Sequence, residues 1–136
     1  MSEQNKAAVR RFFEEIDKGN TDVVDELYAD TLRFYQPGSD PVDKAARKQL
    51  LLMFRSVFPD SSHTIEDMIA EGDRVVTRFT FHGTQRGELM GIPATDRQVA
   101  VQGMVIDRLS AGKIMEEWVS FDMMGMMQQL GVAPTS

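Results

Sequence analysis

The residue best suited to chemistry in this chain is Asp122, a carboxylate that follows an apolar, aromatic segment. If that segment is a regular strand, Trp118 and Ser120 share a face with Asp122, because side chains alternate along a strand. A carboxyl group beside so much apolar surface is expected to have a raised pKa. It could then take a proton from carbon and return it to oxygen without a cofactor. Alternatively, Asp122 caps a helix that begins at the next residue, and the two roles are compatible.

A second candidate is Arg78, in a β-branched and aromatic segment where Arg78 and His82 share one of two alternating faces. If this face meets the helices, the guanidinium needs a carboxylate, and Glu116 is the expected partner. For Arg78 we favour a structural ion pair over direct substrate contact. For His82 we favour a solvated position at the rim over a catalytic base.

Other side chains are expected to form a pocket beside Asp122. Trp118 and Tyr35 would shape its wall, while Arg78 or a hydroxyl group would stabilise a developing oxyanion. A second polar group within reach of Asp122 would favour a catalyst over a carrier. The predicted pocket residues are Tyr35, Phe54, Arg78, His82, Gln102, Met104 and Trp118.

Composition excludes several classes of function. The 136 residues predict one domain over residues 1–136, and a net charge of −6 disfavours nucleic acid or an anionic membrane as partner. There is no cysteine, and the two histidines lie nineteen positions apart without metal-ligand spacing, so neither a metal nor another cofactor is expected. Charged residues interrupt the first thirty positions, which predicts no signal peptide or spanning helix and favours a cytoplasmic location.

Helices must position these groups from the N-terminal half. Apolar residues at helical spacing predict a helix over about 5–18 and a short second helix after Thr21. A strand is expected around 32–36. A third helix should start with Asp40 as N-cap and Pro41 in the first helical position, and end at Phe58-Pro59.

Strands dominate the second half. Four runs rich in β-branched and aromatic residues, 63–70, 73–82, 97–109 and 113–121, predict an antiparallel meander. A short helix follows over about 123–130, with Gly131 in the C′ position. This order predicts an α+β fold, in which a curved antiparallel sheet wraps around the N-terminal helices to form a cone with an internal pocket for a hydrophobic small molecule.

Several short motifs, taken together, carry a resemblance to a known family. They are Phe58-Pro59-Asp60, Glu71-Gly72-Asp73-Arg74-Val75, Gly83-Thr84, Gly87-Glu88-Leu89-Met90-Gly91-Ile92-Pro93, Gly112-Lys113-Ile114, Glu117-Trp118 with Asp122, and Gln129-Leu130-Gly131. In these the chain resembles the SnoaL-like polyketide cyclases of the nuclear transport factor 2-like superfamily. The resemblance implies a cone-shaped fold, a homodimer formed through the sheet, and a cofactor-free intramolecular aldol ring closure. Asp122 would be base and then acid in that reaction.

Two departures from the family pattern keep other functions open. Gln85 stands where many members have His, and Met104 lies where the cyclases place a polar or imidazole side chain. Limonene-1,2-epoxide hydrolase shares the fold but uses Arg-x-Asp on a strand that here offers Arg78-Phe79-Thr80. A ketosteroid-isomerase-like proton shift and a non-catalytic small-molecule-binding dimer remain alternatives.

Overall fold

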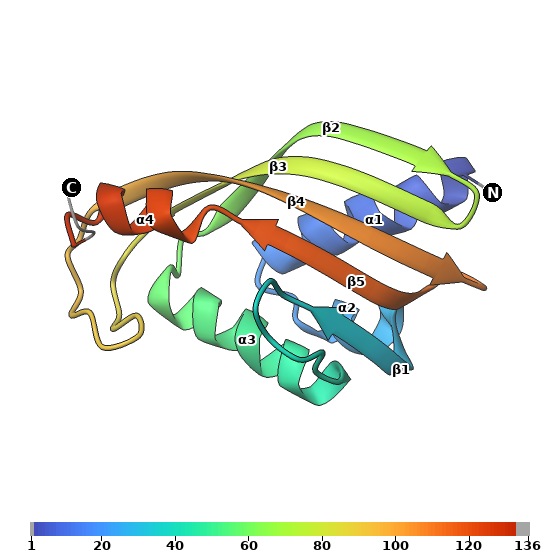
Figure 1. Cartoon of the computed structure of the whole chain (residues 1–136), viewed down its shortest axis with the longest axis horizontal. Helices are drawn as coiled ribbons and strands as arrows, with labels where there is room; N and C mark the ends of the chain where they lie inside the picture. The colour runs from blue at the N-terminus through green and yellow to red at the C-terminus, as the bar shows by residue number, and fades with distance from the viewer. Residues whose placement is uncertain (1, 133–136) are drawn as a thin grey trace.

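The protein, described over residues 2–132 by a computed structural model, consists of a five-stranded sheet with helices on one side and at one end (Figure 1). The helices are α1 (Ser2–Asp17), α2 (Asp22–Leu27), α3 (Lys44–Val57) and α4 (Met123–Gln129). The strands are β1 (Tyr28–Tyr35), β2 (Ser62–Glu71), β3 (Arg74–Thr84), β4 (Gln98–Ser110) and β5 (Lys113–Phe121).

The sheet has the order β1-β5-β4-β3-β2. Strands β2 to β5 pair antiparallel with their chain neighbours, so the predicted meander is confirmed. Strand β1 was predicted as a strand but without a partner. It lies parallel to β5, with Phe34 opposite Glu117 and Tyr35 opposite Trp118.

Helices α1, α2 and α3 cover one face of the sheet (Figure 1). Helix α1 contacts β2 and β3 and buries Val9, Phe12 and Phe13, apolar residues at the helical spacing that predicted it. Helix α3 contacts β1, and α4 contacts β4. The predicted α+β class is therefore confirmed.

The start of α3 differs from the prediction. Asp43, not Asp40, is the N-cap, and its side chain accepts a hydrogen bond from the Ala46 N–H at 2.9 Å. Val42 is held extended because its backbone exchanges two 2.9 Å hydrogen bonds with Phe34. Val42 is therefore bridged to the edge of the sheet, and the helix starts after it.

The face of the sheet that meets the helices, called the inner face below, carries the odd-numbered residues of β3. Val75, Thr77, Phe79 and Phe81 are buried there, whereas Arg78 points to the opposite, outer face. The same alternation buries the odd-numbered residues 99, 101, 105, 107 and 109 of β4. Both alternating sets of β3 contain a valine, so the sequence defines the two faces but not which of them is covered.

The loop between β3 and β4 is shaped by Gln85, which is fully buried. Its Nε2 donates to the carbonyl oxygens of Gly87 and Ile92 at 3.1 and 3.2 Å, and its Oε1 accepts from the Thr95 hydroxyl at 2.7 Å. Gln85 therefore holds the loop by both ends of its amide, which accounts structurally for this departure from the family pattern.

Candidate active site

Asp122 lies where β5 ends and α4 begins. Its Oδ1 accepts a hydrogen bond from the Gly125 N–H at 2.9 Å, so the predicted capping role is confirmed. The side chain is exposed, unlike the expected burial beside an apolar surface, because the strand ends at Phe121 and Asp122 turns into the helix. Its catalytic role stays a prediction.

The position of the Asp122 carboxylate depends on glycine at residue 125. A Cβ atom at Gly125 would overlap Oδ2 of Asp122. The carboxylate therefore occupies space that only glycine leaves free, while its Oδ1 is held by the helix backbone. Oδ1 is thus fixed by the Gly125 N–H, and Oδ2 accepts no hydrogen bond from the described residues.

Next to Asp122, the interior is built from phenyl rings. The phenylalanine cluster comprises Phe13, Phe54, Phe58, Phe79, Phe81 and Phe121. Phe121 connects this cluster to Asp122, with ring centroids 5.8 Å from Phe81 and 6.3 Å from Phe54. Phe54 is the one predicted pocket residue that lies in this interior. Aromatic rings thus surround the inner end of the site.

Six predicted pocket residues lie on the outer face instead: Tyr35, Arg78, His82, Gln102, Met104 and Trp118. Tyr35 and Trp118 stack with centroids 5.2 Å apart and planes within 9°. Met104 lies between Arg78 and Ser120 in the strand register, and its side chain is exposed. The structure brings these residues together on the side of the sheet away from the helices. Their role as substrate contacts stays a prediction.

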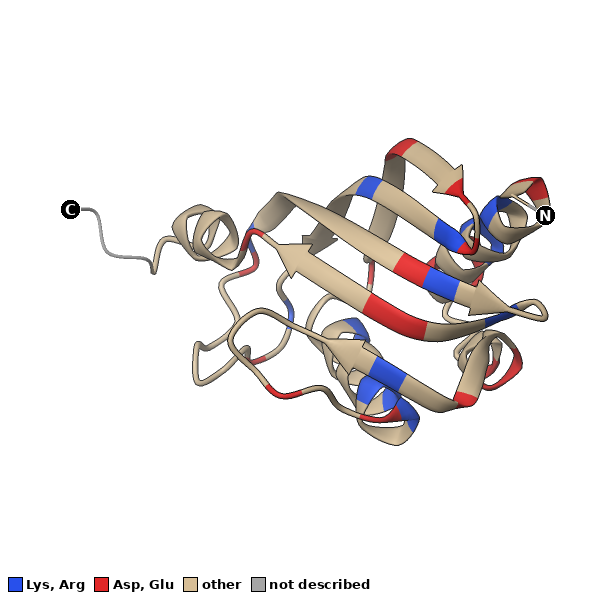
Figure 2. Ribbon diagram, turned by 45° about the vertical axis from the view of Figure 1, so that its right-hand side comes forward, with Lys and Arg blue, Asp and Glu red and all other residues tan. Residues whose placement is uncertain are grey.

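The expected ion pair between Arg78 and Glu116 is wrong. Arg78 donates to Asp67 Oδ2 at 2.9 and 2.7 Å, because Asp67 faces it on β2 while β4 separates it from Glu116. Glu116 instead accepts from Arg108 at 2.7 Å and from the Tyr35 hydroxyl at 3.0 Å. These hydrogen bonds lower the pKa of the Glu116 carboxyl, that from Arg108 most. Red and blue segments accordingly lie side by side on β4 and β5 (Figure 2).

A buried polar cluster that sequence reasoning missed consists of Tyr28, Arg47, Asp107 and Glu117. The Tyr28 hydroxyl donates to Glu117 Oε1 at 2.7 Å, and Arg47 Nε donates to both of these oxygens at 3.1 Å. Burial and the neighbouring Glu117 charge raise the pKa of Asp107 well above its usual range. The available signal was Asp107 itself, a charged residue in step with Val105 and Leu109 on the inner face.

Two buried oxygens have no hydrogen-bond partner within the described residues, Thr77 Oγ1 and Asp107 Oδ1. A protonated Asp107 can donate to Glu117 and so remove one charge from the interior. The cluster then contains one cation and one anion, which matches the pairing that buried charges require. This composition is that of a structural network between α3, β1, β4 and β5.

Hollows in the described structure open at the surface. One of about 340 Å³ lies among Asp25, Asp30, Asp43, Lys44, Ala45 and Lys48, and one of about 320 Å³ lies between α1 and β2. Neither is lined by a member of the phenylalanine cluster. Neither hollow is therefore the expected internal pocket beside the phenylalanine cluster.

Over residues 2–132, no three His, Asp or Glu side chains gather in a way that could hold a metal ion. Within that range, every helix is too short or too polar to span a bilayer.

Comparison with known proteins identifies the family. Helices packed against a curved five-stranded sheet match the cone fold of nuclear transport factor 2-like proteins. The sequence profile of the SnoaL-like polyketide cyclase family matches residues 7–130, and the chain belongs to this family. Among curated proteins, none matches the chain.

Solved structures support the same fold. AclR, a proposed hydroxylase from Streptomyces galilaeus, is 24% identical with a TM-score of 0.92 over 98% of this chain and 100% of its own. IdmH, a proposed polyketide cyclase from Streptomyces antibioticus, is 28% identical with a TM-score of 0.86 over 95% and 99%. A limonene-epoxide-hydrolase-like enzyme of M. tuberculosis is 18% identical with a TM-score of 0.76 over 95% and 90%. AclR and the M. tuberculosis enzyme show the fold alone.

Proposed function

We propose that this protein is a cofactor-free acid–base enzyme that closes a ring in a hydrophobic, polyketide-like molecule by an intramolecular aldol reaction. The observation that carries the proposal is the position of Asp122, exposed at the end of β5 and joined through Phe121 to the phenylalanine cluster. The family match covers this segment, and IdmH, a proposed polyketide cyclase, shares the fold.

The proposed reaction needs only one carboxylate. Ionised Asp122 takes the proton from a carbon between two carbonyl groups, and the resulting carbanion attacks a third carbonyl in the same molecule. A carbon–carbon bond forms, and the carbonyl oxygen becomes an alkoxide. The protonated carboxyl group then returns its proton to that alkoxide, which restores the enzyme. A ligand whose rings cover Asp122 would exclude water from both transfers.

Deuterium exchange into a simple β-keto ester tests the first proton transfer. The acidic C–H of ethyl benzoylacetate and of its naphthalene analogue is followed by NMR in D₂O, at a pH where buffer exchange is slow. The wild type should accelerate exchange, and Asp122→Asn should lower the rate by about 10²- to 10⁴-fold. Asp43→Asn is a matched control, because Asp43 caps α3 with the same 2.9 Å hydrogen bond.

Two results would count against this function. Equal exchange by Asp122→Asn and the wild type would remove Asp122 from the chemistry. Binding of the esters without any acceleration of exchange would favour the non-catalytic carrier.

Epoxide hydrolysis receives less support from the geometry. That reaction needs a carboxylate that can activate a water molecule beside the substrate. The two inner carboxylates, Glu117 and Asp107, are only 3% and 1% exposed. Both belong to the buried polar cluster, so neither is open to a water beside a ligand.

We also propose a homodimer formed through the outer face of the sheet. Ile69 and Met104 are 67% and 52% exposed there, and the stacked Tyr35 and Trp118 extend the apolar surface. Two of the arginines on this face are paired within the chain, Arg78 with Asp67 and Arg108 with Glu116. An apolar surface with internally paired charges suits a second copy of itself better than water.

A further inference from the structure

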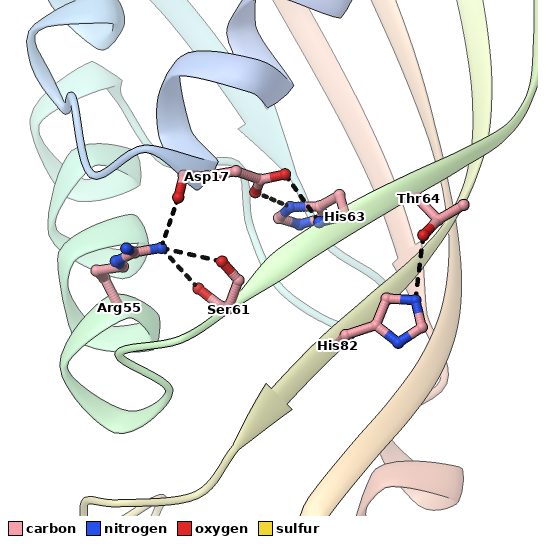
Figure 3. Close-up of polar contacts among 6 residues, drawn as sticks. All are labelled: Asp17, Arg55, Ser61, His63, Thr64 and His82. Atoms are coloured by element: carbon pink, nitrogen blue, oxygen red, sulfur yellow. Dashed lines mark hydrogen bonds and ion pairs between the residues drawn. The ribbon is translucent and has the colours of Figure 1, made fainter.

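The two histidines lie on opposite faces of the sheet. His63, the second residue of β2, is on the inner face opposite Phe81. His82, on β3, is on the outer face and contacts the Thr64 hydroxyl at 3.2 Å (Figure 3). Only His63 therefore belongs to the interior that carries the proposed function.

Asp17 fixes the imidazole of His63. Its Oδ1 lies 2.7 Å from Nδ1 of His63, and its Oδ2 accepts the His63 backbone N–H at 2.8 Å (Figure 3). The backbone oxygen of Asp17 is held in turn by Arg55, which also donates to Ser61 at 3.0 Å. The end of α1, the end of α3 and the start of β2 thus form one rigid support for the ring.

The His63 ring is part of the same aromatic interior as Phe121. Its centroid lies 5.1 Å from Phe13, 5.4 Å from Phe79 and 5.4 Å from Phe81, all members of the phenylalanine cluster. Phe81 contacts Phe121, which precedes Asp122. His63 and Phe121 therefore contact the same two rings, Phe79 and Phe81, and Phe121 is the chain neighbour of Asp122.

The hydrogen bond to Asp17 decides which imidazole nitrogen is available. A carboxylate accepts only, so Nδ1 carries the proton and neutral His63 presents its lone pair on Nε2. This Nε2 has no hydrogen bond to any described residue, and it is not one of the sealed, unpartnered atoms of the interior. The side chain is 16% exposed, so Nε2 remains reachable.

We propose that His63, oriented by Asp17, is a second proton-transfer group, whose Nε2 takes a proton from an oxygen of the bound molecule. The ligand class is a phenol or an enolised carbonyl compound with an aromatic body, since the surrounding walls are phenyl rings. The O–H proton moves to Nε2, which leaves an enolate or phenolate and an imidazolium paired with Asp17, and it returns when the oxygen is reprotonated. The inference rests on the proposed function, because it requires acid–base chemistry in this interior.

NMR of the imidazole nitrogens tests the site without turnover. The measurement uses His82→Gln, in which His63 is the single histidine to observe. This variant is expected to fold fully, because His82 is on the outer face. We expect the Nδ1–H tautomer, and 2-naphthol should shift the Nε2 resonance while Nδ1 keeps its hydrogen bond. In the Asp17→Asn, His82→Gln double variant the tautomer preference should be lost. If the Nε2 resonance of His63 is the same with and without saturating 2-naphthol, the proposal is overturned.

Kinetics separate this inference from the role of Asp122. His63→Gln keeps a donor for Asp17 but lacks a basic nitrogen, and it should lower ethyl benzoylacetate exchange by at least about tenfold. Asp43→Asn, the control used for Asp122, should leave exchange unchanged, because Asp43 caps α3 and belongs to neither proposed group. If Asp122→Asn abolishes exchange while His63→Gln does not alter it, the histidine inference is overturned and the proposed function stands. If His63→Gln lowers exchange while Asp122→Asn does not, His63 is retained as a proton-transfer group and Asp122 is not.

Discussion

Glu117 and Asp107 lie directly opposite each other on β5 and β4, two buried carboxylates that share one arginine, Arg47. Two negative charges at this place would repel each other in a medium that screens them poorly. The pKa of Asp107 is raised accordingly, by burial first and by Glu117 second, which favours its protonated form. A proton on Asp107 would leave Glu117 as the single negative charge beside Arg47.

Replacing Asp107 by asparagine should remove a pH dependence of stability. The pKa of Asp107 is higher in the folded state than in the unfolded state. Its contribution to the free energy of unfolding is therefore complete below about pH 4 and is lost as the pH rises through the folded pKa. The asparagine of Asp107→Asn cannot ionise. In urea unfolding, the free energy of unfolding of this variant should therefore rise relative to the wild type as the pH increases, by up to about 1–3 kcal/mol. The control Asp30→Asn, at a side chain 99% exposed, should show no such trend. If Asp107→Asn lowers the free energy of unfolding by the same amount at every pH, this explanation of the pH dependence is wrong.

Removing the arginine should have a large cost. Arg47→Met leaves Glu117 as an uncompensated buried charge and should lower the free energy of unfolding by about 3–5 kcal/mol. Lys48→Met, one residue along α3, removes only a surface contact with Asp25 and should cost within about 0.5 kcal/mol. Adding Glu117→Gln to Arg47→Met should restore part of the loss. Additive effects of the two changes would show that they do not interact.

Gly125→Ala should separate activity from stability. The new Cβ displaces the Asp122 carboxylate, which forfeits a cap of about 1 kcal/mol, while alanine favours the helix by a similar amount. Thermal unfolding should therefore change little, whereas β-keto ester exchange should fall toward the Asp122→Asn rate. Ala46→Gly, at the corresponding position of α3, is the control for exchange. Full exchange activity in Gly125→Ala would show that the carboxylate position is unimportant.

Met104→Glu should dissociate the proposed dimer. The substitution places a charge in the centre of the exposed apolar surface on the outer face. Light scattering after size exclusion should give a dimer mass for the wild type and a monomer mass for Met104→Glu. Met90→Glu, at an equally apolar side chain 66% exposed on the β3–β4 loop, should remain dimeric. A monomeric wild type would dismiss the interface.

Much of the fold was predictable because its signals are local. Helical spacing located α1, β-branched runs located the meander, and Asp122 before an apolar helix predicted its own cap. The start of α3 was not predictable, because the bridge between Val42 and Phe34 is a contact between separate segments. Only tertiary pairing decides whether a residue such as Pro41 begins a helix or continues an extended segment.

The site was predictable in part for a different reason. Alternation places Arg78, His82 and Trp118 on one face correctly, yet it does not tell which face the helices cover. Ile106 on the outer face is as apolar as Val105 on the inner face, so composition does not distinguish them. The inner acids, the Asp17–His63 contact and the partner of Arg78 all depend on that choice.

The parallel pairing of β1 with β5 has a consequence for biosynthesis. The Tyr28 hydroxyl and the Glu117 carboxylate that receives its hydrogen bond are 89 positions apart in the chain. While the ribosome still holds the last strand, Tyr28 and Phe34 have emerged without the neighbour that covers them. Strand β1 can pair only after β5 has been made, so a nascent chain arrested before β5 exposes an unpaired strand edge that favours aggregation or chaperone binding.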